Sequence, residues 1–195
     1  VNQAIVLDNS KYLNKIIEID QKNLKCVVEP GVILDELNRQ LKPFGLWFPV
    51  DVSTSSRATI GGMAGNNSAG GRSIRYGIMR DNVLSINTIL SDGSKAHFGP
   101  AKKGLSGLEK VLPKLIKIAE RNQKEIETRY PKVLRRVGGY NLDALLPDTL
   151  ASRPGSIGNE KDINLSHLIV GSEGTLAYST NIELKLSPLP PPKIM

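Results

Sequence analysis

Residues 58–71, with the sequence ATIGGMAGNNSAGG, constrain the fold of this chain more than any other stretch. The stretch holds five glycines in fourteen residues, and each glycine costs about 0.5–1 kcal/mol inside a regular helix or strand. We therefore predict a loop here. A glycine leaves no side chain between a ligand and the main chain, and successive N–H groups of such a loop form a concave anion site. Ile60 and Met63 indicate that the loop packs against a core instead of moving freely at the surface.

Two common phosphate-binding loops do not fit this stretch. No Gly-Lys-Ser/Thr follows it, so it is not a Walker loop, and a GxGxxG pattern after a strand is absent, so it is not a Rossmann fingerprint. Asn66, Asn67 and Ser68 add side-chain donors to those of the backbone. The pattern predicts a loop of another design, which holds a phosphate-bearing or carbonyl-rich planar ligand.

The rest of the chain alternates between short apolar runs and a few amphipathic stretches. Turn signals predict two hairpins, one of 16–20 with 25–29 and one of 83–90 with 95–98. We also predict a first short strand at 4–7 and a closing strand pair of 175–178 with 182–186. Apolar spacing predicts helices at 33–41 and 108–122, the second continuing through 127 with Pro113 in its first turn. Because regular βαβ alternation is missing, we expect an α+β fold and not a doubly wound parallel sheet.

The net charge of +7 and the pI of about 9.5 suit an anionic partner. The charges are spread out, and the densest basic cluster, Lys132, Arg135 and Arg136, is short. Only 3 Phe, 5 Tyr and 1 Trp are present, which supplies few stacking platforms for nucleic acid. No run approaches the roughly 20 apolar residues of a membrane span. We expect no nucleic-acid partner and no membrane span, and attribute the charge to attraction of a pyrophosphate or a carboxylate.

The residues that most often carry catalysis are scarce. The single cysteine, Cys26, lies in an alternating apolar segment and is expected in the core; it allows no internal disulfide and is compatible with a reducing compartment. His97 and His167 are the only histidines, and neither has a neighbour suited to a metal or a catalytic dyad. We predict no metal site and no catalytic residue within this chain.

A second small-residue segment, GSEGTL at residues 171–176, places two glycines around a carboxylate just before a strand. Glu173 could accept hydrogen bonds from a ribose or a backbone amide, or it could simply hold a tight turn.

Taken in order, the motifs resemble a known family. VEPGV (28–32), FPVDVSTSSRATIGGMAGNNSAGG (48–71), RYG (75–77), LSDG (90–93), VGSEGTL (170–176) and a proline-rich exit resemble the FAD-binding type-4 (PCMH-like) domain of the vanillyl-alcohol oxidase superfamily. Within it, the chain looks most like flavin-dependent D-lactate, glycolate and D-2-hydroxyglutarate dehydrogenases. KVLRRVGGYNLDAL (132–145) resembles the long-chain members, whose flavin part is followed by an iron–sulfur part.

The resemblance implies two α+β subdomains with FAD between them, the first one truncated at its N-terminus. Residues 1–30 would be the remainder of the first subdomain, 31–187 the second, and 188–195 an exit linker. The residues implied to bind the cofactor are Asp51, Ser53, Thr59, Gly61, Gly62, Asn66, Asn67, Ser68, Gly70, Gly71, Glu173 and Gly174. One departure from the family pattern is Ala177, where many members carry glycine.

The implied activity is that of an FAD-dependent oxidoreductase in which a D-2-hydroxy acid gives a hydride to the flavin. A first loop of the form PRGGGTSLSG and a substrate-binding cap domain are absent from this sequence, so we expect the chain alone to be inactive. Electrons would pass to an acceptor or to an iron–sulfur domain or subunit, in the cytoplasm or peripherally on the inner membrane. Two alternatives stay open: a sugar-lactone or alditol-type flavin oxidase, and a non-catalytic nucleotide- or anion-binding module.

Overall fold

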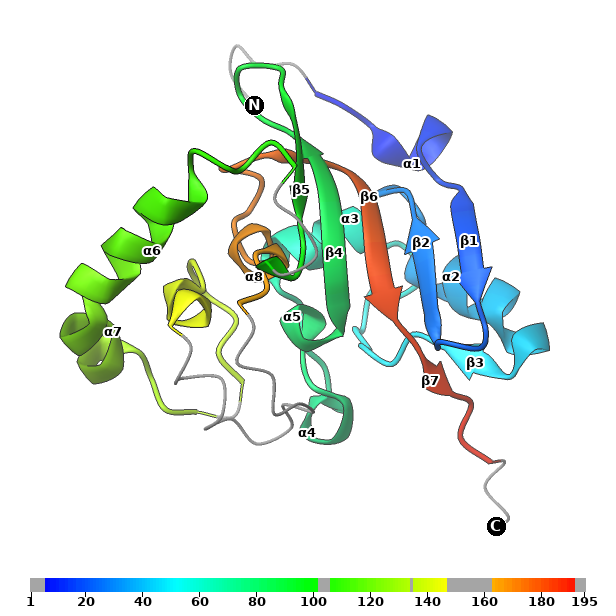
Figure 1. The fold of residues 1–195 in the computed structure, drawn as a ribbon. Coiled ribbons are helices and arrows are strands. Elements are labelled where there is room, and N and C mark those ends of the chain that lie inside the picture. The colour runs from blue at the N-terminus through cyan, green and yellow to red at the C-terminus, as the bar shows by residue number, and fades with distance from the viewer. Residues whose placement is uncertain (1–5, 102–105, 134, 147–162, 192–195) are drawn as a thin grey trace.

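An antiparallel sheet of five strands is the centre of the fold (Figure 1). The structure is a computed structural model that describes residues 6–101, 106–133, 135–146 and 163–191. The strands, in their order across the sheet, are β1 (Ile16–Asp20), β2 (Lys25–Val28), β6 (Tyr178–Lys185), β4 (Val83–Ile89) and β5 (Lys95–Phe98). Both predicted hairpins, β1–β2 and β4–β5, are present. The mixture of this sheet with helices confirms the α+β class.

Short helices fill most of the connections between the strands. They are α1 (Asn9–Tyr12), α2 (Leu34–Leu41), α3 (Ile60–Asn66), α4 (Ser73–Tyr76), α5 (Met79–Asn82), α6 (Leu112–Arg121), α7 (Gln123–Arg129) and α8 (Ser166–Ile169), with 3-10 turns η1 (Lys42–Phe44) and η3 (Leu142–Leu145). Figure 1 shows α2 and α3 behind the sheet. A small second sheet pairs β3 (Leu46–Trp47) with β7 (Ser187–Pro188).

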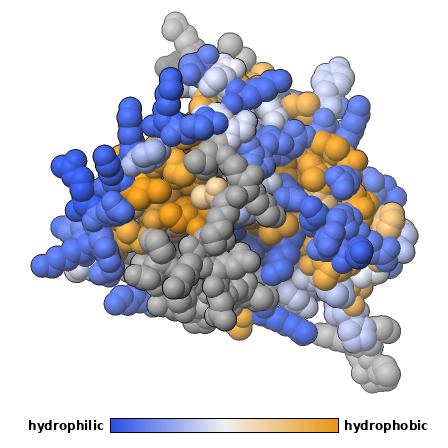
Figure 2. Space-filling view, in the orientation of Figure 1, coloured by the Kyte–Doolittle hydropathy of each residue, from blue (hydrophilic) through white to orange (hydrophobic). Residues whose placement is uncertain are grey.

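The core lies between the sheet and these helices. Leu34, Leu37 and Leu41 of α2 are buried at the spacing of one helical face, and Ile182 and Leu184 of β6 are fully buried. Hydrophilic side chains cover much of the surface visible in Figure 2, where the apolar surface gathers in separate patches. Among the described residues, no helix has both the length and the apolar character needed to cross a bilayer.

Cys26 lies in this core, as expected from its apolar neighbours. It is 1 % exposed, and burial, with a further contribution from Glu183, raises the pKa of its thiol to about 12. The thiol is therefore protonated at neutral pH and acts as a small apolar side chain.

The predicted helices 33–41 and 108–122 are present with small shifts. The first begins at Leu34, and Gly45 ends the following η1 turn in the left-handed region at φ +68°. The second is divided into α6, which has Pro113 in its first turn, and α7, which continues to Arg129. Both contact η3.

Two strand predictions were wrong. Val6 and Leu7 are exposed and lie in no strand, while residues 4 and 5 of that predicted strand fall outside the described part. The predicted closing pair is one continuous strand, β6. The polar residues in the middle of β6, which separate the two predicted strands, pair with β4. An irregularity in this register accommodates Thr180, whose Oγ1 donates to the Asn87 carbonyl at 3.0 Å.

The glycine-rich stretch is also not a loop throughout, because its first half forms α3. Thr59 caps the helix by accepting a hydrogen bond from the Gly62 N–H at 3.2 Å, and Asn67 ends it at φ +56°. The side chains of Ile60, Met63 and Ala64 are buried. Their packing against the core overrides the low helix propensity of the glycines.

The division at residue 30 remains a prediction, although residues on both sides of it share one sheet through the β2–β6 pairing. The start of the predicted exit linker pairs with the domain, since Leu189 N–H donates to the Gly45 carbonyl at 2.8 Å. Residues 1–5 and 192–195 of the outer predicted segments lie outside the described part.

Candidate functional site

The two small-residue segments singled out in the sequence lie side by side. Gly171 N–H donates to the Ala64 carbonyl at 2.9 Å, and Glu173 N–H donates to the Gly65 carbonyl at 2.9 Å. The side chains also meet, because Asn66 Nδ2 donates to Glu173 Oε1 at 3.1 Å. Glu173 adopts φ +51°, a left-handed conformation that is uncommon for a residue with a side chain. This junction of α3 with the Glu173 turn separates two clefts.

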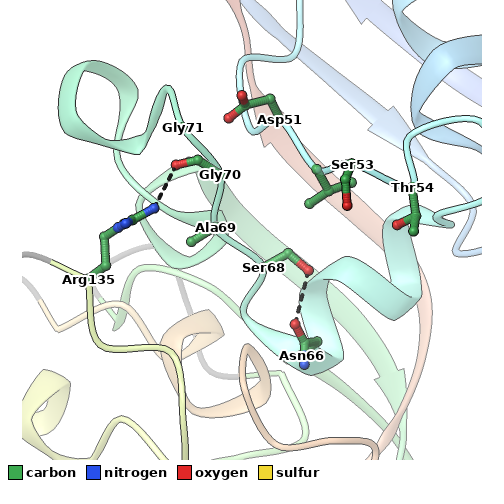
Figure 3. A pocket seen from close by; sticks show the side chains of 10 residues that line it. Asp51, Ser53, Thr54, Asn66, Ser68, Ala69, Gly70, Gly71 and Arg135 are labelled. Atoms are coloured by element: carbon green, nitrogen blue, oxygen red, sulfur yellow. Dashed lines mark hydrogen bonds between the residues drawn. The ribbon is translucent and has the colours of Figure 1, made fainter.

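Cleft A has a volume of about 660 Å³ and contains half of the predicted cofactor-binding residues (Figure 3). Its lining consists of Asp51, Val52, Ser53, Thr54, Asn66, Ser68, Ala69, Gly70, Gly71 and Arg135. The predicted members are Asp51, Ser53, Asn66, Ser68, Gly70 and Gly71. A cleft of this size is in the range that holds small molecules and cofactors.

The backbone of cleft A is held tightly at one point and left open at others. A Cβ on Gly70 would lie 1.8 Å from the Asp51 carbonyl oxygen, so only glycine fits there. Asp51 Oδ1 also accepts from the Arg72 N–H at 3.0 Å. Several lining residues have main-chain N–H groups that make no hydrogen bond within the described chain, among them Ser53, Thr54, Ala69 and Gly71. These donors are available to phosphate or carbonyl oxygens.

Cleft B, on the other side of the junction, has a volume of about 380 Å³. It is lined by Asn9, Pro30, Thr59, Gly61, Gly62, Gly65, Ile169, Ser172, Glu173, Gly174, Ala177, Tyr178 and Ser179. The predicted members are Thr59, Gly61, Gly62, Glu173 and Gly174. Ala177, the departure from the family pattern, belongs to the same wall.

The first turn of α3 does not provide open amides to cleft B, contrary to our expectation for the whole stretch. Ile60 N–H donates to the Val32 carbonyl, Gly61 N–H to the Pro30 carbonyl, and Gly62 N–H to the Thr59 hydroxyl. What the glycines supply here is space. The nearest atoms to a Cβ on Gly65 would be Glu173 Cα and Gly174 N, both at 3.9 Å, so a side chain would narrow the cleft.

Asn67 is the one predicted site residue that lines neither cleft. Its side chain is fully buried: Oδ1 accepts from the Arg80 N–H at 3.0 Å, and Nδ2 donates to the Arg136 carbonyl at 3.5 Å. Asn67 ends α3 in the left-handed conformation, which turns its side chain inward while Asn66 stays exposed. Its place in the structure is that of a helix cap.

A buried polar cluster lies next to the junction and supports it. Asn141 accepts from Arg80 Nη1 at 2.7 Å and donates through Nδ2 to the Val170 carbonyl at 2.8 Å. Arg136 Nη2 donates to Asp143 Oδ1 at 2.6 Å. Burial lowers the pKa of Arg80 to about 10, and burial also lowers the pKa of Arg136. Arg80 still carries its charge at neutral pH, and the cluster fixes residues 136–143 against the two glycine-rich segments.

Sequence reasoning did not identify Arg135, Asn9 or Tyr178 as site residues. Arg135 belongs to the basic cluster at residues 132–136, which was noted for its charge alone. Tyr178 Oη donates to Asn9 Oδ1 at 2.6 Å across cleft B. Nothing in the sequence marks this pair, because its two members are 169 residues apart and meet only in the folded chain.

Neither histidine is among the lining residues of the two clefts. His97 Nδ1 lies 2.7 Å from Asn87 Oδ1 on the neighbouring strand. His167 is part of α8. In the described ranges, no group of three or more His, Cys, Asp or Glu residues is arranged to hold a metal ion.

Comparison with known proteins identifies the class. Residues 1–99 match the family model of the FAD binding domain, and this is half of the chain. The chain therefore belongs to the family of FAD binding domains, and FAD is the cofactor of that family.

The curated relatives are considerably longer proteins. The chain is 34 % identical over 203 residues to D-2-hydroxyglutarate dehydrogenase of Pseudomonas putida, covering 99 % of this chain and 19 % of that protein. It is 32 % identical over 198 residues to the Escherichia coli protein of the same name, covering 97 % and 18 %. It is 30 % identical over 183 residues to glycolate oxidase subunit GlcD of Bacillus subtilis, covering 94 % and 27 %. The chain thus spans about a fifth to a quarter of their length.

Among solved structures, alkyldihydroxyacetonephosphate synthase has the same fold. The TM-score is 0.55 at 20 % identity, with 92 % of this chain and 24 % of the other chain covered. This likeness supports the fold assignment alone.

Proposed function

We propose that this chain is the FAD-holding part of an oxidoreductase that oxidises a D-2-hydroxy acid by hydride transfer to flavin. The observation that carries the proposal is the junction of α3 with the Glu173 turn, which has a cleft on each side. The names of the relatives, D-2-hydroxyglutarate dehydrogenase and glycolate oxidase subunit, support a 2-hydroxy acid as the substrate.

The residues present suit an elongated, anionic dinucleotide. Cleft A offers open N–H groups to oxygens, and cleft B offers a wall without side chains at Gly61, Gly62 and Gly65. Because Asn66 lines cleft A and its neighbour Gly65 lines cleft B, a ligand longer than either cleft would run past the Asn66–Glu173 hydrogen bond. We assign the cofactor contacts to the lining residues of both clefts and leave Asn67 as a support.

When bound, FAD supplies the hydride acceptor, which is why a protein of this kind needs few reactive side chains of its own. In the proposal, this chain orients the cofactor and shields one side of it from water. The group that accepts the substrate hydroxyl proton would belong to a cap domain in another part of the polypeptide. An electron acceptor, or an iron–sulfur domain or subunit, would complete the reaction. The cytoplasm or the inner-membrane surface is the proposed location, which agrees with a single unpaired thiol.

The test uses the full-length polypeptide that carries this chain. We expect a yellow protein with flavin absorbance, which bleaches when D-2-hydroxyglutarate, D-lactate or glycolate is added without oxygen. Bleaching by sugar lactones or alditols alone would favour the other flavin oxidases. A protein that takes up no flavin, yet binds short oligonucleotides with a steep salt dependence, would replace the proposal with an anion-binding module.

A further inference from the structure

We propose that Arg135 is the anion-binding residue of cleft A and that it takes an oxyanion, either a phosphate or a carboxylate. The identity of that oxyanion rests on the proposed function: it is the pyrophosphate of FAD or the carboxylate of the 2-hydroxy acid. The binding of an oxyanion does not rest on it, because it follows from the charge and the donors of the cleft.

Arg135 reaches the cleft from a segment far away in the sequence. Its Nη1 donates to the Gly70 carbonyl at 3.1 Å, across the opening from Asp51 and Ser53 (Figure 3). It is the only basic residue in the lining of cleft A, as far as the structure describes the chain. The side chain is exposed, so a ligand in the cleft can reach it.

The neighbouring arginine explains why Arg135 is held in place. Arg136 is directed to the opposite side, where it bonds to Asp143 and lies over the Tyr130 ring at 4.3 Å from the ring centre. One arginine of the pair therefore anchors the segment in the buried cluster, and the other is presented to the cleft. The anchor reduces the backbone freedom that Arg135 would otherwise lose on binding a ligand.

The charge of Arg135 has no acidic partner in the described chain. Among the described residues, its one hydrogen bond goes to a neutral carbonyl, and no ion pair joins it to a carboxylate. Of the described lining residues, Asp51 is the single acid, and its Oδ1 accepts from the Arg72 N–H. A guanidinium has five N–H donors, and the bond to Gly70 uses one of them. The unused donors can bind an oxyanion in the two-pronged way that favours carboxylates and phosphates.

The backbone adds donors to this cation. The N–H groups of Ser53, Thr54, Ala69 and Gly71 make no hydrogen bonds within the described chain and belong to the same lining. A cleft that combines a guanidinium without an ion-pair partner among the described residues with several open N–H groups is suited to an anion.

The experiment compares Arg135→Gln, which removes the charge but keeps a donor for Gly70, with Arg135→Lys, which keeps the charge. Lys132→Gln is the matched control, because Lys132 is an exposed cation of the same segment that does not line the cleft. Three probes are titrated in the full-length protein: FAD into the apoprotein, inorganic pyrophosphate into the apoprotein, and oxalate into the flavin-loaded protein, where flavin absorbance reports binding. Thermal melting verifies that each variant is folded.

We expect Arg135→Gln to weaken at least one probe about tenfold or more, Arg135→Lys to weaken it less, and Lys132→Gln to change it less than twofold. Weaker FAD and pyrophosphate binding identifies the phosphate as the oxyanion. Weaker oxalate binding with unchanged FAD binding identifies the carboxylate. If Arg135→Gln binds all three probes as the control does, the inference is wrong. If the wild-type protein takes up no FAD, the proposed function fails, and the pyrophosphate titration still decides the role of Arg135.

Discussion

The two halves of residues 58–71 have similar compositions and opposite uses of the main chain. In α3, the N–H groups of the first turn all donate within the protein, to Val32, Pro30 and Thr59. In residues 68–71, by contrast, the N–H groups of Ala69 and Gly71 make no such bond within the described chain. Small residues let the first half pack closely and let the second half stay open to a ligand. Composition alone does not separate these two reasons for a glycine, but substitutions can.

The largest effect is expected at Gly70. Alanine there would place its Cβ 1.8 Å from the Asp51 carbonyl oxygen and 2.2 Å from Asp51 Oδ1, and backbone atoms have little room to move. We expect Gly70→Ala to lower the free energy of unfolding by about 3 kcal/mol. Urea titration followed by the fluorescence of Trp47, the single tryptophan, measures it. Gly71→Ala is the control, because its Cβ would lie 3.7 Å from Asp51 Oδ2; equal losses in both variants would contradict the packing argument.

A somewhat smaller loss is expected for Asn141→Ala, which tests the cluster that supports both halves. The change leaves Arg80 Nη1 and the Val170 carbonyl without their partner in a buried place. Leaving such buried groups unsatisfied lowers the free energy of unfolding by about 1–3 kcal/mol, and we expect a loss of about 2 kcal/mol for Asn141→Ala. Asn122→Ala removes a comparable amide-to-carbonyl bond at an exposed helix end, and should change unfolding by less than about 0.5 kcal/mol. If the buried cluster contributed little to stability, the urea unfolding curves of Asn141→Ala and Asn122→Ala would be similar.

Gly61→Ala is expected to cost about 1.5 kcal/mol, because the Cβ would lie 2.6 Å from Pro30 Cβ and 2.9 Å from the Pro30 carbonyl. Gly62→Ala serves as its comparison, since the only close atom is the Thr59 hydroxyl at 3.1 Å. If Gly62→Ala destabilised the protein as much as Gly61→Ala in the same urea assay, contact with Pro30 would not be the reason for the first glycine.

Local patterns were sufficient to predict the sheet hairpins and α2. The β1 and β2 strands are joined by a short polar turn, and Leu34, Leu37 and Leu41 recur at helical spacing. Both signals arise from residues that are close in the sequence. The α+β class followed from the order of these elements.

Long-range contacts explain what the sequence did not predict. Helix α3 forms because buried Ile60 and Met63 pack against the core, and β6 is continuous because β4 pairs along it. Eleven of the twelve site residues that the family resemblance implied line one cleft or the other. The exception, Asn67, differs from Asn66 only in the direction of its side chain at a helix end, which no sequence pattern shows. Arg135 was missed because the hydrogen bonds of Arg136 to Asn141 and Asp143, which no local pattern shows, hold its segment beside cleft A.

The smallest change in stability is also the sharpest test of the comparison, and it is expected at Gly65. Alanine in this helical position should raise the free energy of unfolding by about 0.5–1 kcal/mol, because it restricts the unfolded chain and nothing lies closer than 3.9 Å to its Cβ. The same methyl group would narrow cleft B between α3 and the Glu173 turn, so FAD binding should weaken about tenfold in a fluorescence titration.

Gly138→Ala is the control: no atom lies within 4 Å of its Cβ and it lines neither cleft, so it should leave FAD binding unchanged. A gain in stability together with a loss of FAD affinity would mean that residue 65 has to be glycine to leave room for the ligand. Unchanged affinity in a stabilised protein would mean that cleft B is not part of the flavin site, and that the first half of the stretch serves packing alone.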